Sequence, residues 1–229
     1  MMPRNKEKNV NRTPAQVRAL PAQRNAQQRL RLGLMALALA GGALVALSLQ
    51  PAQAATPAAA AAPAAAKLVP AGSEVTFTAK QLGVPLDGRF KRFDAQIALD
   101  PKQPQTGKVA FAIELGSVAI NPESDSELGK NLWFDTAKFP KATFTSTAIK
   151  GLGGGRFEAT GTLNIKGQQR PVTVPVTLTQ AGGQTTATGG FTLKRLDFKI
   201  GEGEWADTSV VANEVQVRFK LLLQGLGPL

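Results

Sequence analysis

The stretch RFEATGTLNIKGQQRPVTVPVTLTQAGGQTTATGGFTLK, residues 156–194, alternates apolar and polar side chains over three successive segments. In the first segment, Phe157 and Ile165 lie on the apolar face and threonines lie on the other. A period of two is typical of a β-strand with one buried face. Short turns at 167–171 and 181–184 separate the segments, which predicts neighbouring antiparallel strands.

The same alternation recurs in five further segments, at 75–79, 93–99, 109–115, 143–149 and 215–221. Eight such strands predict an all-β fold, in which one antiparallel sheet closes into an eight-stranded barrel. Closure removes the exposed edges that an open sheet would present. The interior of such a barrel is either packed solid or open enough for one small ligand.

Small residues are frequent on the predicted inward faces. They indicate either close packing of the sheet or an interior that is left open, and we favour an apolar cavity. Such a cavity suits an alkyl or prenyl chain, because each CH₂ group removed from water contributes about 0.8 kcal/mol. The small inward residues are Ala79, Ala95, Ala159, Gly161, Ala187 and Gly189.

One segment, residues 121–139, breaks the strand pattern. Asn121 can cap a helix, Pro122 suits the first helical turn, and Ser124 with Glu127 fits a capping box. A short helical segment is therefore predicted to cross one end of the barrel. Its aromatic side chains could form a plug that packs on the core, or a lid over a cavity mouth.

The chain contains no Cys, no His and no Tyr. Disulfides, thiolate or imidazole zinc sites, and Ser–His or Cys–His catalytic pairs are therefore excluded. The predicted inward stripes also carry no carboxylate that could act as a general acid or base. These absences predict a binding module rather than an enzyme, with no metal site and no cofactor.

The N-terminal part resembles an export signal. Eight Lys or Arg side chains and one acid in residues 1–31 carry most of the net charge of +11. An uncharged apolar run follows at 32–49, and then the small-residue pattern Ala52-Gln53-Ala54. This order is typical of a signal peptide, and an uncleaved membrane anchor would have the same topology. Both alternatives predict an exported domain close to a membrane, with no nucleic-acid partner.

The domain boundaries follow from composition. Residues 1–54 are predicted to be the signal peptide or anchor helix, and residues 55–66 form an Ala/Pro-rich linker. The linker lacks large apolar side chains, so it cannot offset the entropy cost of ordering. The folded barrel domain is predicted to occupy residues 67–229.

A series of short motifs runs along this domain, at 73–78, 80–84, 88–90, 93–94, Asp125, Leu128, 133–135, 138–140, 142–146, 163–167, 170–174, 195–198, 200–201 and 203–207. Together these motifs resemble those of the YceI-like family of periplasmic polyisoprenoid-binding proteins. The resemblance rests on the order and spacing of the motifs together, from about residue 69 to residue 223. Many members have His at the position of Gln81, and an Arg-Asp-x-His run at the position of residues 124–127.

This resemblance implies a lipocalin-like barrel with an elongated apolar interior. It also implies a periplasmic carrier that holds a long polyisoprenoid, such as a prenyl quinone or prenyl phosphate, without chemistry. The alternatives are a structural or stress-response barrel without a bound lipid, and an enzyme acting on an apolar substrate. The oligomeric state stays open, a homodimer included.

The candidate ligand contacts are of two kinds. Each apolar candidate is either a cavity wall or a plain core residue. A basic cluster of Arg89, Lys91 and Arg92 could meet a phosphorylated head group or could be a solvated loop face. The apolar candidates are Phe77, Leu82, Phe93, Ile97, Phe111, Ile113, Trp133, Phe134, Phe144, Leu163, Ile165 and Phe191.

Overall fold

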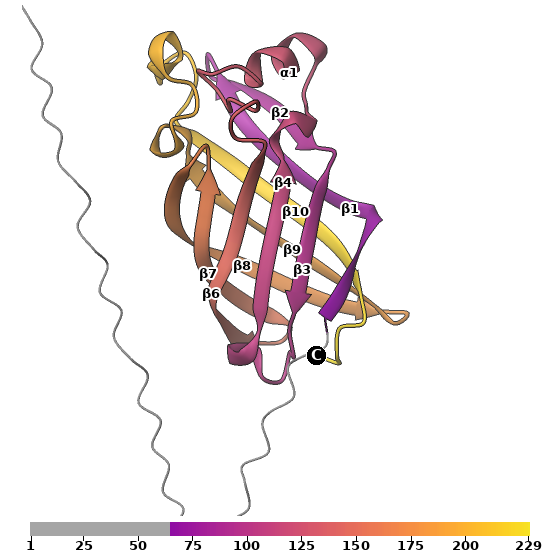
Figure 1. The fold of residues 1–229 in the computed structure, drawn as a ribbon. Coiled ribbons are helices and arrows are strands. Elements are labelled where there is room, and N and C mark those ends of the chain that lie inside the picture. Colours follow the sequence, from indigo (N-terminus) through magenta and orange to yellow (C-terminus); the bar gives the residue numbers. More distant parts are fainter. Residues whose placement is uncertain (1–64) are drawn as a thin grey trace, which may run out of the picture. The chain divides into compact units, whose positions relative to one another are not determined.

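The computed structural model of the protein describes residues 65–229 (Figure 1). The predicted signal peptide or anchor, and the predicted linker up to residue 64, lie outside the described residues. Within residues 65–229 no helix has the length and apolar character needed to cross a membrane.

The described part consists almost entirely of strands. One short helix, α1 (Pro122–Leu128), and four single 3₁₀ turns interrupt them. The strands are β1 (Ala65–Gln81), β2 (Val84–Phe90), β3 (Phe93–Ala98), β4 (Lys108–Glu114), β5 (Val118–Ala119), β6 (Lys141–Gly153), β7 (Arg156–Ile165), β8 (Gln168–Ala181), β9 (Gln184–Lys194) and β10 (Glu214–Gln224).

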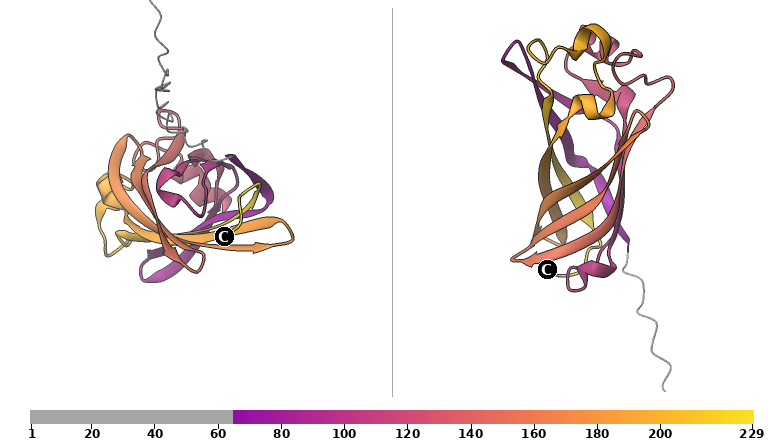
Figure 2. Two further views of the ribbon diagram at one scale, coloured as in Figure 1. Left: turned by 90° about the horizontal axis from the view of Figure 1, so that it is seen from below. Right: turned by 90° about the vertical axis from the view of Figure 1, so that its left-hand side faces the viewer.

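Eight of these strands form a closed antiparallel ring in the order β1-β3-β4-β6-β7-β8-β9-β10. The ring closes where β10 pairs with β1, with Phe77 opposite Val217. The end-on view in Figure 2 shows the strands surrounding a central axis. The predicted eight-stranded barrel is confirmed, and each predicted alternating segment lies in one of its eight strands. Strands β2 and β5 were not predicted. They lie outside the ring, where β2 pairs with β1 and β5 pairs with β2.

Strand β1 pairs with β10 on one side and with two different strands in turn on the other. Its first residues pair with β3, and its second half pairs with β2 from Val75 onward. The register with β10 shifts between Val69 and Glu74. The Ser73 side chain bridges the two strands at this shift, because its Oγ donates to the Val69 carbonyl at 2.7 Å and accepts from the Leu222 N–H at 2.9 Å. Strand β1 begins at Ala65, inside the tract predicted to be linker.

The side chains of the ring alternate as the period of two requires. In β7, Phe157 and Leu163 are buried, whereas Arg156 and Thr160 are exposed. The inward side chains form two apolar clusters, one at each end of the barrel. The lower cluster includes Val75, Ile97, Phe157, Leu178 and Leu223, and the upper cluster includes Leu115, Trp133, Leu163, Phe198 and Ile200.

The two inward glycines allow neighbouring side chains to pack closely and do not leave open space. A Cβ atom on Gly161 would lie 2.7 Å from the Phe144 ring, and one on Gly189 would lie 2.4 Å from the Phe219 ring. Each glycine therefore makes room for a phenyl ring on a neighbouring strand. Of the predicted inward alanines, Ala79, Ala159 and Ala187 border the cavities described below, whereas Ala95 is buried and borders neither.

A cap covers the end of the barrel that carries α1 (Figure 1). The Asn121 side chain accepts from the Ser124 N–H at 2.9 Å, so the predicted cap is confirmed. The predicted capping box is wrong, because Ser124 lies inside the helix and Glu127 pairs with Lys130 instead. Helix α1 and the loops that follow it pack on the upper cluster.

The C-terminal residues lie at the opposite end of the barrel from α1 (Figure 1). The Gln180 side chain holds them, because its Nε2 donates to the Gly227 carbonyl at 2.8 Å and its Oε1 accepts from the Leu229 N–H at 3.2 Å. Leu226 packs against the lower cluster from this segment.

Candidate functional site

The lower half of the barrel encloses a cavity of about 150 Å³. Its wall is apolar apart from Thr143. Alanines 159 and 187, whose side chains reach only a short way inward, border this space. The other lining residues come from all sides of the ring and include Val75, Ile97, Leu99, Phe111, Ile149, Phe157, Val176, Leu178, Phe219, Leu223 and Leu226.

The upper half encloses a second cavity, of about 220 Å³, beneath α1 and the cap loops. Most of its wall is apolar, and Ala79 borders it. It differs from the lower cavity in having polar side chains in its wall. The apolar lining includes Phe77, Leu115, Leu128, Trp133, Phe134, Ile165 and Trp205, and the polar lining is Lys80, Gln81, Ser124, Glu127 and Arg195.

The two cavities meet at a waist, which we define by the five residues that line both: Ile113, Ala142, Leu163, Phe191 and Val217. The cavities therefore follow one another along the barrel axis. At about 30 Å³ per water-sized group, they have room for roughly five such groups below the waist and roughly seven above it. A ligand that fills both must be long and narrow.

Five of the phenylalanines that line the cavities are only partly buried, although they point inward. Phe77, Phe111, Phe144, Phe191 and Phe219 are all of intermediate exposure. A solid core would bury such side chains fully, because protein interiors are close-packed. Their exposed area faces the cavities, so this apolar surface is available to a ligand.

Aromatic pairs shape the wall of the upper cavity. Phe90 lies 5.5 Å from Phe77 and 6.2 Å from Phe134, measured between ring centroids. Trp133 and Trp205 lie 5.5 Å apart under the cap. Phe134 and Trp133 therefore have both of the predicted roles. They pack on the core, as a plug would, and they line the cavity, as a lid would.

Ten of the twelve apolar candidates line a cavity. Leu82 does not, because it lies at the tip of the β1–β2 hairpin with φ 51° and its residue is 72% exposed. Phe93 packs against Phe111, with 5.9 Å between ring centroids, but it borders neither cavity. The ten are Phe77, Ile97, Phe111, Ile113, Trp133, Phe134, Phe144, Leu163, Ile165 and Phe191.

Sequence reasoning missed several lining residues. Val217 and Phe219 lie on a predicted inward stripe, so the alternation itself could have identified them. Trp205 and Arg195 lie in 3₁₀ turns, where no periodic signal points to the interior. Gln81, Ser124 and Glu127, at which the chain departs from the family pattern, line the upper cavity.

The three head-group candidates lie elsewhere. Arg89, Lys91 and Arg92 line an outer groove of about 570 Å³, at the place where β1 leaves β3. None of them lines either cavity. Acidic side chains share the groove, and Arg92 forms an ion pair with Glu114. This guanidinium holds the pKa of the Glu114 carboxyl below its ordinary value.

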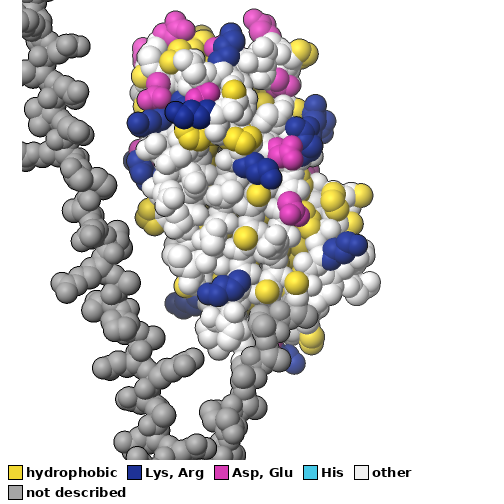
Figure 3. All heavy atoms as spheres, in the orientation of Figure 1, with side chains coloured by type: hydrophobic (Ala, Val, Ile, Leu, Met, Phe, Trp, Pro, Cys, Tyr) yellow, Lys and Arg dark blue, Asp and Glu magenta, His cyan; other side chains and the backbone are white. Residues whose placement is uncertain are grey.

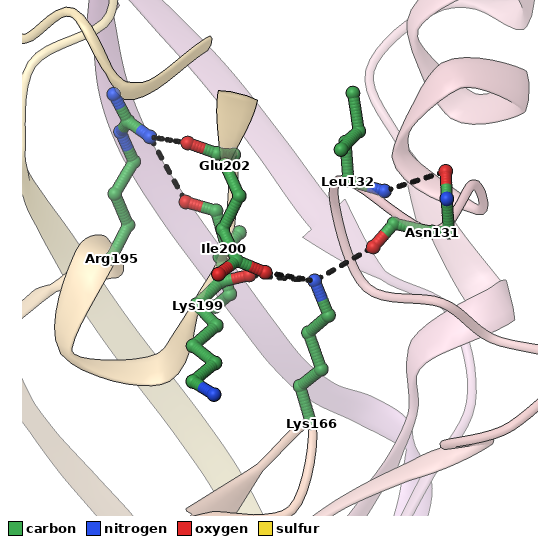
Figure 4. Close-up of polar contacts among 8 residues, drawn as sticks. Asn131, Leu132, Lys166, Arg195, Lys199, Ile200 and Glu202 are labelled. Atoms are coloured by element: carbon green, nitrogen blue, oxygen red, sulfur yellow. Dashed lines mark hydrogen bonds and ion pairs between the residues drawn. The ribbon is translucent and has the colours of Figure 1, made fainter. Parts of the chain in front are cut away.

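Lys166 ties the cap loops to the barrel (Figure 4). It lies in the tight β7–β8 turn with φ 51°, and only 7% of the residue is exposed. Its Nζ donates to the carbonyls of Asn131 and Lys199, each at 2.7 Å, and pairs with the Glu202 carboxylate at 3.2 Å. One amine thus joins the loop after α1 to the loop after β9.

Arg195 organises the same end of the barrel and is 2% exposed. Its guanidinium donates to five backbone carbonyls at 2.7–3.1 Å. Burial lowers the pKa of Arg195, but the group stays charged because a guanidinium is not deprotonated in proteins. The five carbonyls belong to Ile200, Gly201, Trp205, Val211 and Ala212.

Replacing Lys166 with methionine should lower the free energy of unfolding by about 2 kcal/mol, because two buried carbonyls lose their donor. Glu202→Gln should cost less than about 1 kcal/mol, because that carboxylate is 45% exposed and its amide still accepts. Urea unfolding followed by circular dichroism measures both changes. Equal effects of the two substitutions would contradict this description of Lys166.

Among residues 65–229 no group of three or more acidic side chains is placed to hold a metal ion. Glu127 is the one carboxylate among the described residues that line the two cavities. The site therefore presents apolar surface, with a few polar side chains at the α1 end.

Comparison with known proteins agrees with this architecture. The sequence model described as YceI-like domain matches residues 67–223. Protein YceI of Salmonella arizonae and that of Salmonella paratyphi B are each 39% identical over 110 residues. That alignment covers 47% of this chain and 57% of each relative, so the chain spans little more than half the length of these relatives.

Solved structures share the barrel. BcnA of Burkholderia cenocepacia is 40% identical with a TM-score of 0.66, and the match covers 68% of this chain and 99% of BcnA. The YceI protein of Campylobacter jejuni shows the same fold, with 22% identity and a TM-score of 0.55, and the match covers 60% of this chain and 83% of that protein. A polyisoprenoid binding domain from Saccharophagus degradans also shows it, with 18% identity and a TM-score of 0.57, and the match covers 70% of this chain and 98% of that domain. The chain, with a matching domain over most of its length and the same barrel, belongs to the YceI-like family.

Proposed function

We propose that the protein is a non-enzymatic binding or carrier protein that holds a long isoprenoid chain in its barrel. The observation that carries this proposal is the pair of apolar cavities that meet at the waist along one axis. A barrel filled by its own side chains would leave no such space. The Saccharophagus degradans domain, which is described as polyisoprenoid binding, has the same fold.

The energetics favour a long apolar ligand. Each CH₂ group transferred from water to an apolar wall contributes about 0.8 kcal/mol. The cavities have room for roughly twelve such groups in total, or about two isoprene units. The corresponding gain is about 10 kcal/mol, which is comparable to the cost of association.

The proposed location is the periplasm, with the domain near a membrane that contains the isoprenoid. The apolar run at 32–49 and the Ala52-Gln53-Ala54 pattern support export, and the ligand class is membrane-resident. The proposed ligands are a prenyl quinone or a prenyl phosphate.

Two measurements test this function. Organic extraction of protein purified from its source, followed by mass spectrometry, should release an isoprenoid. A prenyl quinone should also quench tryptophan fluorescence in a saturable way, because the chain has two tryptophans and both line the upper cavity. An extract without isoprenoid, together with no saturable quenching, would refute the proposal.

A further inference from the structure

The barrel interior has one polar end. Below the waist the wall is apolar apart from Thr143. The charged, amide and serine side chains all line the upper cavity, at Lys80, Gln81, Ser124, Glu127 and Arg195. If an isoprenoid binds as proposed above, its head group lies under α1 and its chain runs down through the waist.

Arg195 is the only guanidinium in the described cavity walls, but it has no donor to offer a ligand. A guanidinium has five N–H groups. All five donate to backbone carbonyls, which belong to the cap loops and to the segment just before β10. Phosphate recognition by arginine depends on free N–H groups in a planar fork, and that fork is occupied here.

The remaining charges at this end nearly cancel. Lys80 contributes one positive charge, and Glu127 contributes one negative charge that is shared with Lys130. Figure 3 shows acidic and basic side chains intermingled toward the α1 end on the face that it displays. A diphosphate placed here would meet the amine of Lys80, because the donors of Arg195 are engaged and Lys130 is paired with Glu127. The Glu127 carboxylate repels a diphosphate and so offsets part of the attraction.

Neutral donors are present instead. The indole N–H groups of Trp133 and Trp205 are buried and have no hydrogen-bond partner among the described residues. An unpaired buried donor costs about 1–3 kcal/mol, which an acceptor oxygen on a ligand would remove. Gln81 and Ser124 add an amide and a hydroxyl to the same wall.

We propose that the upper cavity selects isoprenoids with a neutral, oxygen-bearing head group, such as a quinone ring, over prenyl diphosphates of the same chain length. The selection has two parts: an arginine whose donors are already used, and a carboxylate at the position of Glu127. Both are features of this chain's own residues.

The test compares the two ligand classes on the full-length protein. A prenyl quinone and a prenyl diphosphate of equal length are measured, the first by tryptophan quenching and the second by displacement of the quinone. The quinone should bind at least about tenfold more tightly. Glu127→Gln should strengthen diphosphate binding about fivefold by removing the like charge, and should change quinone binding less than about twofold.

Glu123→Gln is the matched control, because Glu123 lies exposed on the same helix and lines neither cavity. It should leave both affinities unchanged. Equal or tighter binding of the diphosphate by the unmodified protein would overturn the head-group inference alone. Binding of neither ligand would overturn the proposed function, and this inference with it.

Discussion

Replacing Arg195 with methionine is expected to lower the free energy of unfolding by about 4 kcal/mol or more. Methionine fills a similar volume but leaves five cap carbonyls without their donor. Urea unfolding followed by far-ultraviolet circular dichroism measures the change.

Arg195→Lys provides the control for charge. Lysine keeps the positive charge but has three donors in place of five, so it should recover only part of the loss. If methionine at this position cost less than about 1 kcal/mol, the guanidinium would not organise the cap as described.

Replacing Ala142 with phenylalanine should prevent a long chain from passing the waist. Ala142 is 5% exposed and lines both cavities, so a phenyl ring there enters the passage between them. A prenyl quinone long enough to reach below the waist should bind more than about tenfold more weakly, because excluding even two CH₂ groups costs about 1.6 kcal/mol. A quinone ring without a prenyl chain fits above the waist and should change less than about threefold.

Ala148→Phe is the matched control on the same strand, because Ala148 is exposed on the outer face of β6. It should bind both quinones like the unmodified protein. Thermal unfolding verifies that Ala142→Phe is folded, since overpacking a waist costs about 1–3 kcal/mol. Unchanged binding of the longer quinone by a folded Ala142→Phe protein would show that the cavities are not used as one site.

The cavity wall was largely predictable and the head-group end was not. Phe111, Leu163 and Phe191 face the interior because each alternates with polar neighbours along its own strand. Arg89, Lys91 and Arg92 were grouped by closeness in sequence, yet they line an outer groove. Nothing in the sequence around Arg195 indicates that its guanidinium turns inward and meets five carbonyls.

The sequence by itself determined the eight barrel strands and the short helix at one end, because a two-residue alternation and a capping asparagine act between near neighbours in the chain. The order and spacing of its motifs determined the family. Only the tertiary structure decided that Ala142 and Val217 meet at a waist, that Gly161 and Gly189 lie under phenyl rings, and that Lys166 and Arg195 join the cap loops. These contacts depend on the register in which distant strands close the ring, and that register is a property of the whole barrel rather than of any one segment.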